Sequence, residues 1–271
     1  MRPGLRGILI TATAVGSGAV IVGESVSRGL RTTGRLSGWL LLSLVVLLML
    51  FSARKKVPFL PLGSVAAWLD WHAAWGVVSL AVFGVHSGWR LPNGNLEIAL
   101  STMFLIVTLT GVLGLWLSRT FARRLATRGQ EVIFERIPAL RREIRENAEA
   151  LLLAAAEKRG GTSVGVFYAQ RLLPFFERPR NSAAHLLNSD RPLRLLLAEM
   201  SALERYLEES ERDTLETFRE LVAMKDDLDY HRALQGALKA WLFVHVPASW
   251  SLLILAFVHG ALAQVFAAGT P

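Results

Sequence analysis

The chain has 271 residues, 52% of them hydrophobic, and its mean hydropathy of +0.37 excludes an ordinary soluble domain and indicates a membrane protein. It contains no cysteine, which excludes disulfides, thiolate-held iron–sulfur clusters and any cofactor tethered through a cysteine. The net charge of +8 is spread through the segments between apolar stretches, so we expect no nucleic-acid partner and read the basic residues as membrane-topology signals.

The first apolar stretch, residues 7–23, consists mainly of small and β-branched side chains. It predicts either a fifth membrane span or an uncleaved signal sequence, because no small-residue cleavage site of the A-x-A kind is visible. Four later stretches each have about the length that crosses the ~30 Å hydrocarbon core, although the first of them is short. They are residues 36–53, 65–89, 96–118 and 237–264. The sequence therefore predicts an all-α integral membrane bundle of four to five transmembrane helices in lipid.

Residues 119–236, between the third and the last of these spans, have the composition of a soluble helical insert. Arg- and Glu-rich segments with helical spacing cover 131–158 and 192–235, and a stretch punctuated by glycine and proline separates them. The second segment favours a helical hairpin or a short coiled coil. The membrane bundle then comprises residues 1–118 and is completed by 237–271. The insert is either a stabilising cap or a docking platform for a partner protein.

The basic residues near the span ends predict the orientation. Nine lie on the side of the 54–64 loop and the insert, and four lie on the other side. The positive-inside rule therefore places that loop and the insert in the cytoplasm, with the bundle in a bacterial inner membrane. If residues 7–23 do not cross, Arg2 and Arg6 join the opposite side and the excess falls to nine against six.

Four of the six histidines lie in apolar segments as two pairs, His72/His86 and His245/His259, each with a spacing of 14 residues. Fourteen residues return a helix to within about 40° of its starting face and advance it by about 21 Å. The two spans that carry them begin on the same side of the membrane, so they run parallel with His72 and His245 at matching depth. If the two helices are neighbours, His72 pairs with His245 and His86 pairs with His259.

Two imidazoles facing each other across neighbouring helices can hold one flat iron porphyrin, so the two pairs predict two non-covalent b-type haems stacked across the bilayer. A single zinc site is excluded, because zinc prefers clustered ligands and the two levels are ~21 Å apart. The alternatives are core histidines that are satisfied by hydrogen bonds and a proton relay.

Small residues beside the histidines are candidates for haem contact. Gly76 lies one turn after His72, where a missing side chain lets a porphyrin approach the backbone, and Ser249 has the same offset from His245. Ordinary small-residue helix packing explains both equally well. Pro247 is expected to kink the last helix near His245.

Charged residues near the span ends have two interpretations. Propionate partners for the inner haem would be Arg54, Lys55, Arg232 and Lys239, and Arg90 would serve the outer one; each is equally a topology signal. Asp70 is either an interfacial carboxylate or a proton acceptor at a quinone site. His185 and His231 lie in the insert and need no role.

Three stretches carry a resemblance to a known family: PLGSVAAWLDWH leading into H-x3-G-x9-H, TLTGVLGLWLSR, and HVPASWSLLILAFVH. They resemble bacterial membrane b-type cytochromes of the cytochrome b-like and ferric-reductase-like kind, over about half of the chain. The resemblance implies a bis-histidine dihaem bundle whose iron ligands are His72, His86, His245 and His259. The chain lacks the flavin or nicotinamide domain of NADPH-driven reductases and the Pro-Glu-Trp-Tyr motif of respiratory cytochrome b.

The expected function is transmembrane electron transport as the cytochrome b subunit of an oxidoreductase complex, with the cofactor carrying the electron. Donor and acceptor are expected on iron–sulfur or multihaem cytochrome subunits, and a quinone is a further candidate cofactor. The alternatives are a self-contained quinol oxidoreductase and a haem-free membrane anchor or proton pathway.

Overall fold

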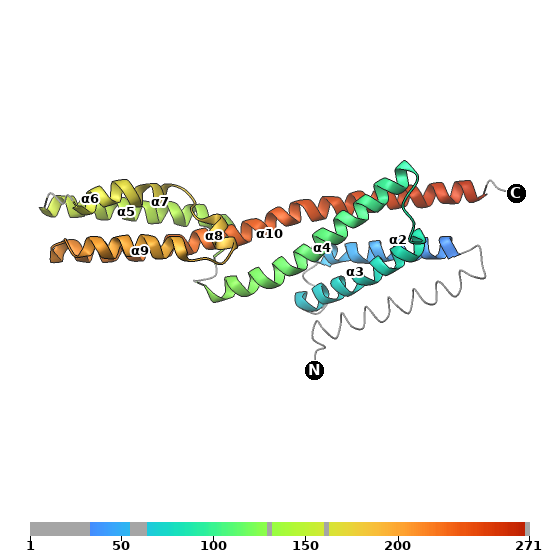
Figure 1. Cartoon of the computed structure of the whole chain (residues 1–271), viewed down its shortest axis with the longest axis horizontal. Helices are drawn as coiled ribbons and strands as arrows, with labels where there is room; N and C mark the ends of the chain where they lie inside the picture. Colours follow the sequence, from blue (N-terminus) through green and yellow to red (C-terminus); the bar gives the residue numbers. More distant parts are fainter. Residues whose placement is uncertain (1–32, 55–63, 129–131, 160–162, 269–271) are drawn as a thin grey trace, which may run out of the picture. The chain divides into compact units, whose positions relative to one another are not determined.

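The computed structural model describes residues 33–54, 64–128, 132–159 and 163–268, and within these ranges it contains helices and no strand (Figure 1). The predicted all-α fold is confirmed. Residues 7–23 lie outside the described residues. The helices are α2 (Thr33–Arg54), α3 (Val65–Ser87), α4 (Asn95–Thr127), η1 (Phe134–Arg136), α5 (Ile137–Arg159), α6 (Ser163–Phe167), η2 (Tyr168–Leu172), α7 (Leu173–Glu177), α8 (Ser182–Leu186), α9 (Arg191–Glu204) and α10 (Glu209–Ala268).

Contacts divide the chain into a membrane unit, residues 1–117 with 241–271, and an insert unit, residues 118–240. Helices α4 and α10 contribute to both. The boundary between the units at 240/241 and the predicted limit of the insert at 236/237 both fall inside α10, which continues from Glu209 through Ala268 as one helix. The reason is that Gly236 and Pro247 are isolated helix breakers, and the segment between them has no cap or loop residues that would end a helix.

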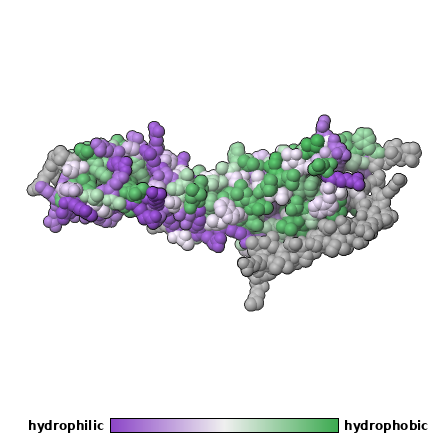
Figure 2. All heavy atoms as spheres, in the orientation of Figure 1, coloured by the Kyte–Doolittle hydropathy of each residue, from purple (hydrophilic) through white to green (hydrophobic). Residues whose placement is uncertain are grey.

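The membrane unit has the surface of a protein that lies in lipid. Three described helical segments are long and apolar enough to cross a membrane, namely Val65–Ser87, Asn95–Thr127 and Glu211–Phe266, and α2 contains a shorter apolar stretch, Leu36–Phe51. Large apolar side chains point outward, including Phe243, which is 87% exposed, and Leu109, which is 68% exposed. Figure 2 shows this apolar surface over α4 and the C-terminal part of α10. Outward-facing apolar side chains are stable in hydrocarbon, and helices satisfy their own backbone there.

The core of the membrane unit is small. Leu44 of α2 packs against Ala74, Val78 and Val82 of α3. A second cluster, Val45, Phe104 and Leu252, joins α2, α4 and α10. The Ser64 hydroxyl accepts the Ala67 N–H at the start of α3, and Gly88 ends the helix with a left-handed φ of 60°.

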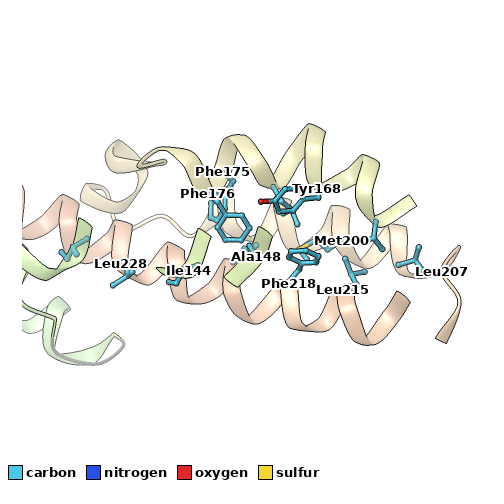
Figure 3. Close-up of a cluster of buried hydrophobic side chains, with 14 residues drawn as sticks. Ile144, Ala148, Tyr168, Phe175, Phe176, Met200, Leu207, Leu215, Phe218 and Leu228 are labelled. Carbon is cyan, nitrogen blue, oxygen red and sulfur yellow. The ribbon is translucent and has the colours of Figure 1, made fainter. Parts of the chain in front are cut away.

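The insert unit has a conventional hydrophobic core. Figure 3 shows Tyr168, Phe176 and Phe218 packed together with Met200 and Leu215. Phe218, Met200 and Leu215 are fully buried. This core gathers α5, the short helices of 163–177, α9 and the first part of α10, so the insert unit is stabilised by burial from water.

A buried ionic cluster lies beside that core. Lys225 Nζ is 2.5 Å from Asp229 Oδ2 and donates to the Arg178 carbonyl at 2.9 Å. Arg141 Nε lies 3.3 Å from Asp229 Oδ1, and the Arg180 backbone N–H donates to Asp229 at 2.8 Å. Burial lowers the pKa of Lys225 to about 8, although Asp229 opposes this shift. Asp229 is therefore the shared anion of two basic side chains.

The insert histidines belong to the same buried region. His185 and His231 are each 2% exposed. His185 Nε2 lies 3.5 Å from Asp226 Oδ1, and His231 Nε2 donates to the Arg128 carbonyl at 2.9 Å. Burial lowers the pKa of His185, with Asp226 opposing it. Both rings are structural parts of the insert unit.

Replacing Asp229 with Ala should destabilise the insert unit by about 3–5 kcal/mol, because Lys225 and Arg141 would keep buried charge without their anion. Asp227→Ala is the matched control, because the Asp227 side chain is 39% exposed and forms an ion pair with Arg128 near the surface. This replacement should lower the free energy of unfolding by about 0–1 kcal/mol. The stability of the insert unit is measured by denaturing the full chain in detergent while monitoring the near-ultraviolet circular dichroism of tyrosine. All three tyrosines lie in the insert unit and all eight tryptophans in the membrane unit. Equal losses of stability in the two variants would contradict the assignment of Asp229 as the shared anion of Lys225 and Arg141.

Candidate functional site

The structure places the four membrane histidines on two helices, His72 and His86 on α3 and His245 and His259 on α10. The ring centres of His86 and His259 are 6.3 Å apart and their planes are nearly perpendicular, at 87°. His72 and His245 lie close enough to interact electrostatically. These are the pairs that equal spacing on parallel helices predicts, and α3 and α10 run in the same direction (Figure 1).

The separation of His86 and His259 is one at which both imidazoles could bind a single metal ion. With about 2 Å from the metal to each imidazole nitrogen, and about 1.1 Å from that nitrogen to its ring centre, the centres of two such rings lie about 6 Å apart. The observed 6.3 Å agrees with this distance. The described residues contain no group of three or more His, Cys, Asp or Glu placed to hold a metal ion.

Helix α2 supports His86. Ser37 Oγ lies 3.1 Å from His86 Nδ1, and the same hydroxyl donates to the Gly34 carbonyl at 3.2 Å. A side chain at Gly38 would place its Cβ 3.0 Å from His86 Cε1. The Ser37–Gly38 dipeptide therefore supplies a hydroxyl for the ring nitrogen and the space for the ring itself.

Helix α4 supports His245 in the same way. Thr110 Oγ1 lies 2.8 Å from His245 Nδ1 and donates to the Ile106 carbonyl at 2.7 Å. A Cβ at Gly111 would lie 3.5 Å from His245 Cε1, in ordinary contact. Thr110–Gly111 is thus a second hydroxyl–glycine dipeptide, on a different helix, with the same two contacts to a different histidine.

Trp241 completes the surroundings of His245. Its ring stacks on the imidazole with centres 5.3 Å apart and an angle of 21° between planes, and its Nε1 donates to the Thr110 carbonyl at 2.7 Å. A Cβ at Gly114 would overlap the indole at 1.9 Å, so only glycine leaves room for this tryptophan. Thr110 therefore binds α10 through both its hydroxyl and its carbonyl.

The hydroxyl contacts indicate one tautomer for His86 and His245. Each hydroxyl has one proton and donates it to a carbonyl of its own helix, so its oxygen accepts the Nδ1–H of the histidine. Both rings then carry their proton on Nδ1 and present the Nε2 lone pair. A hydrogen bond that fixes one ring nitrogen in this way is typical of metal-ligating histidine.

The other member of each pair is held differently. His72 Nδ1 is buried and has no partner of hydrogen-bond geometry, although the ring interacts with the Leu48 backbone and lies 5.1 Å from the Phe51 ring. No hydrogen bond to His259 is recorded among the described residues. At Gly76 a Cβ would meet nothing within 4 Å, so the face of α3 next to His72 is open, as contact with a flat ligand requires.

A cavity of about 510 Å³ lies at the His86/His259 level, which is within the size range of sites for small organic ligands. Its walls are mainly apolar, and Arg90, Asn93 and Glu97 provide polar groups on one part of the lining. Arg90, expected as an outer propionate partner, therefore lines the same cavity as the two histidines. A mainly apolar cavity with a few polar groups suits an organic ligand. Arg90 could pair with an acidic group of such a ligand, whereas Glu97 would repel one.

Of the remaining predicted residues, Ser249 contacts the backbone of a site histidine, and no described contact brings Arg232 or Lys239 to either site. Arg232 and Lys239 belong to the insert unit, where Lys239 pairs with Glu135. Ser249 donates to the His245 carbonyl at 2.7 Å, so its hydroxyl serves the α10 backbone two residues after Pro247. The side chain of Arg54, and all of Lys55, lie outside the described residues.

The chain was compared with family models, with curated proteins and with solved structures, and nothing matches it in any of the three comparisons.

Proposed function

We propose that this chain is the cytochrome b subunit of a membrane redox complex and carries electrons across the bilayer through two b-type haems. The observation that carries the proposal is the pairing of four histidines at two levels on α3 and α10, with an inter-ring distance of 6.3 Å at the His86/His259 level. The two levels are about 21 Å apart along the helices. That separation places one site toward each side of the ~30 Å hydrocarbon core.

The residues present fit such a group on several counts. The Nε2 atoms of His86 and His245 are the free nitrogens, glycines at 38, 76 and 111 leave room beside the rings, and Arg90 lines the cavity where acidic edges of a ligand need a cation. A haem held by two imidazoles supplies one-electron transfer with no coordination position open for oxygen. The residues of this chain would hold, orient and shield the haem. The chain has no cysteine that could tether it.

The absence of cysteine indicates which redox centres the partner subunits would supply. With no cysteine, it holds no thiolate-bound iron–sulfur cluster, so we infer that terminal donors and acceptors are other subunits, of the iron–sulfur or multihaem cytochrome kind, or membrane quinone. The insert unit is folded around its own core and is available as a docking surface. We place the membrane unit in a bacterial inner membrane with the insert on the cytoplasmic side, following the excess of basic residues there.

The purified chain should carry two haems, both extractable into acidified organic solvent because no cysteine binds them. A pyridine haemochrome assay against protein concentration measures the ratio, and a reduced-minus-oxidised spectrum should show a six-coordinate b-type signal. Well-folded protein with no haem would instead support the haem-free alternative, in which Ser37 and Thr110 simply satisfy buried histidines. One haem per chain would contradict the two-level arrangement.

Single replacements of the histidines should separate the two sites. His72→Ala and His245→Ala should each remove the same haem, and His86→Ala and His259→Ala should each remove the other, because each pair holds one group. Redox titration of the four variants measures which component is lost, and tryptophan circular dichroism checks that the membrane unit stays folded. If His72→Ala and His86→Ala removed the same haem, the cross-helix pairing would be refuted.

The insert should be accessible from the cytoplasm. Reporter fusions within 160–162 and protease digestion of intact spheroplasts against inverted vesicles measure its side. Cleavage in spheroplasts would reverse the proposed orientation while leaving the pairing of the histidines unchanged.

A further inference from the structure

We propose that Ser37 and Thr110 are positioning residues that set the reduction potentials of two separate haems, one each. The inference rests on the proposed function and goes beyond it, because it concerns the residues that tune the ligands rather than the ligands. Its basis is the repeated hydroxyl–glycine dipeptide, Ser37–Gly38 on α2 and Thr110–Gly111 on α4.

Each dipeptide contacts one member of a different histidine pair. Ser37 lies 3.1 Å from His86 Nδ1, and Thr110 lies 2.8 Å from His245 Nδ1. Their opposite partners are His259, for which the described residues record no hydrogen bond, and His72, whose Nδ1 has no partner of hydrogen-bond geometry. Each site therefore combines one imidazole that contacts a hydroxyl with one for which the described residues record no hydroxyl contact.

The direction of the effect follows from the direction of the hydrogen bond. Each hydroxyl donates its proton to a carbonyl of its own helix, at Gly34 or Ile106, and accepts the Nδ1–H of the histidine. Donation from Nδ1 makes the imidazole a more basic ligand. A more basic ligand favours the oxidised, more positive iron, so each hydroxyl lowers the potential of its own site.

Thr110 should have the larger effect. Its contact with the histidine is shorter than that of Ser37, 2.8 against 3.1 Å, and its carbonyl also accepts Trp241 Nε1, which stacks on the same imidazole. The ring of His245 is therefore contacted on one face by Trp241 and at Nδ1 by Thr110. His86 has the hydroxyl contact and the close approach to Gly38.

The chain offers matched controls for both positions. Thr108 lies two residues before Thr110 on α4 and donates to the Phe104 carbonyl at 2.8 Å, with no contact to a histidine recorded. Ser43 on α2 donates to the Trp39 carbonyl at 2.8 Å in the same manner. Thr108→Val and Ser43→Ala therefore remove a hydroxyl that bonds its own helix and leave the histidines untouched.

The test is a redox titration of the full chain, with electron paramagnetic resonance of the oxidised protein, for Thr110→Val, Thr110→Ser, Ser37→Ala and the two controls. We expect Thr110→Val to raise the potential of the component that His72→Ala removes, and Ser37→Ala to raise the one that His86→Ala removes, each leaving the other unchanged. Thr110→Ser should stay near the parent, and both controls should titrate like the parent.

Three results would overturn the inference while leaving the proposed function intact. These are an unchanged potential in both test variants, an equal shift in test and control, or a shift of both components by one replacement. If Thr110→Val loses its haem, Thr110→Ser decides: retention at the parent potential supports the hydroxyl, and loss in both variants shows a packing role and overturns it. A parent protein without haem would overturn the proposed function itself, which is a separate outcome.

Discussion

A polar group between the lipid tails needs a partner within the protein, and this requirement governs the arrangement of the membrane unit. Four imidazoles lie in helical segments that consist mainly of apolar residues. Two of them meet hydroxyls that are already bonded to their own backbone, and those two rings face the other two across α3 and α10. The glycines at 38 and 114 fit the same requirement, because the helices must approach closely for the His86 ring and the Trp241 indole to be accommodated.

The two units use charge in opposite ways. The membrane unit keeps ionisable side chains near its span ends and relies on neutral imidazole and hydroxyl groups inside. The insert unit buries full charges, with Lys225 completely covered and Asp229 shared by two basic side chains. Such a cluster contributes little net stability as a whole but makes the loss of any one member costly. It fixes how α5, the 178–186 region and α10 meet within the insert unit.

The sequence was sufficient for the helical class, the apolar segments and the levels of the histidines, because uninterrupted apolar runs and a 14-residue spacing are local properties of the chain. The supporting hydroxyls were missed because Ser37 and Thr110 are 49 and 135 residues from their histidines, and packing decides which faces meet. The hydroxyl–glycine dipeptides at 37–38 and 110–111 are a weak signal, because the same pattern also occurs at 33–34 and 87–88. Lys225 and Asp229 were missed for another reason: an i, i+4 pair of opposite charge is typical of a solvated helix face.

The way Thr110 is bonded also bears on how the membrane unit assembles. Because its hydroxyl proton is held by the Ile106 carbonyl four residues earlier, α4 alone already presents an acceptor oxygen in a fixed direction. When α10 docks, only the histidine tautomer with a proton on Nδ1 can satisfy that oxygen. The ring of His245 is thereby oriented by contacts within the chain alone, and its Nε2 is the nitrogen that these contacts leave for a ligand.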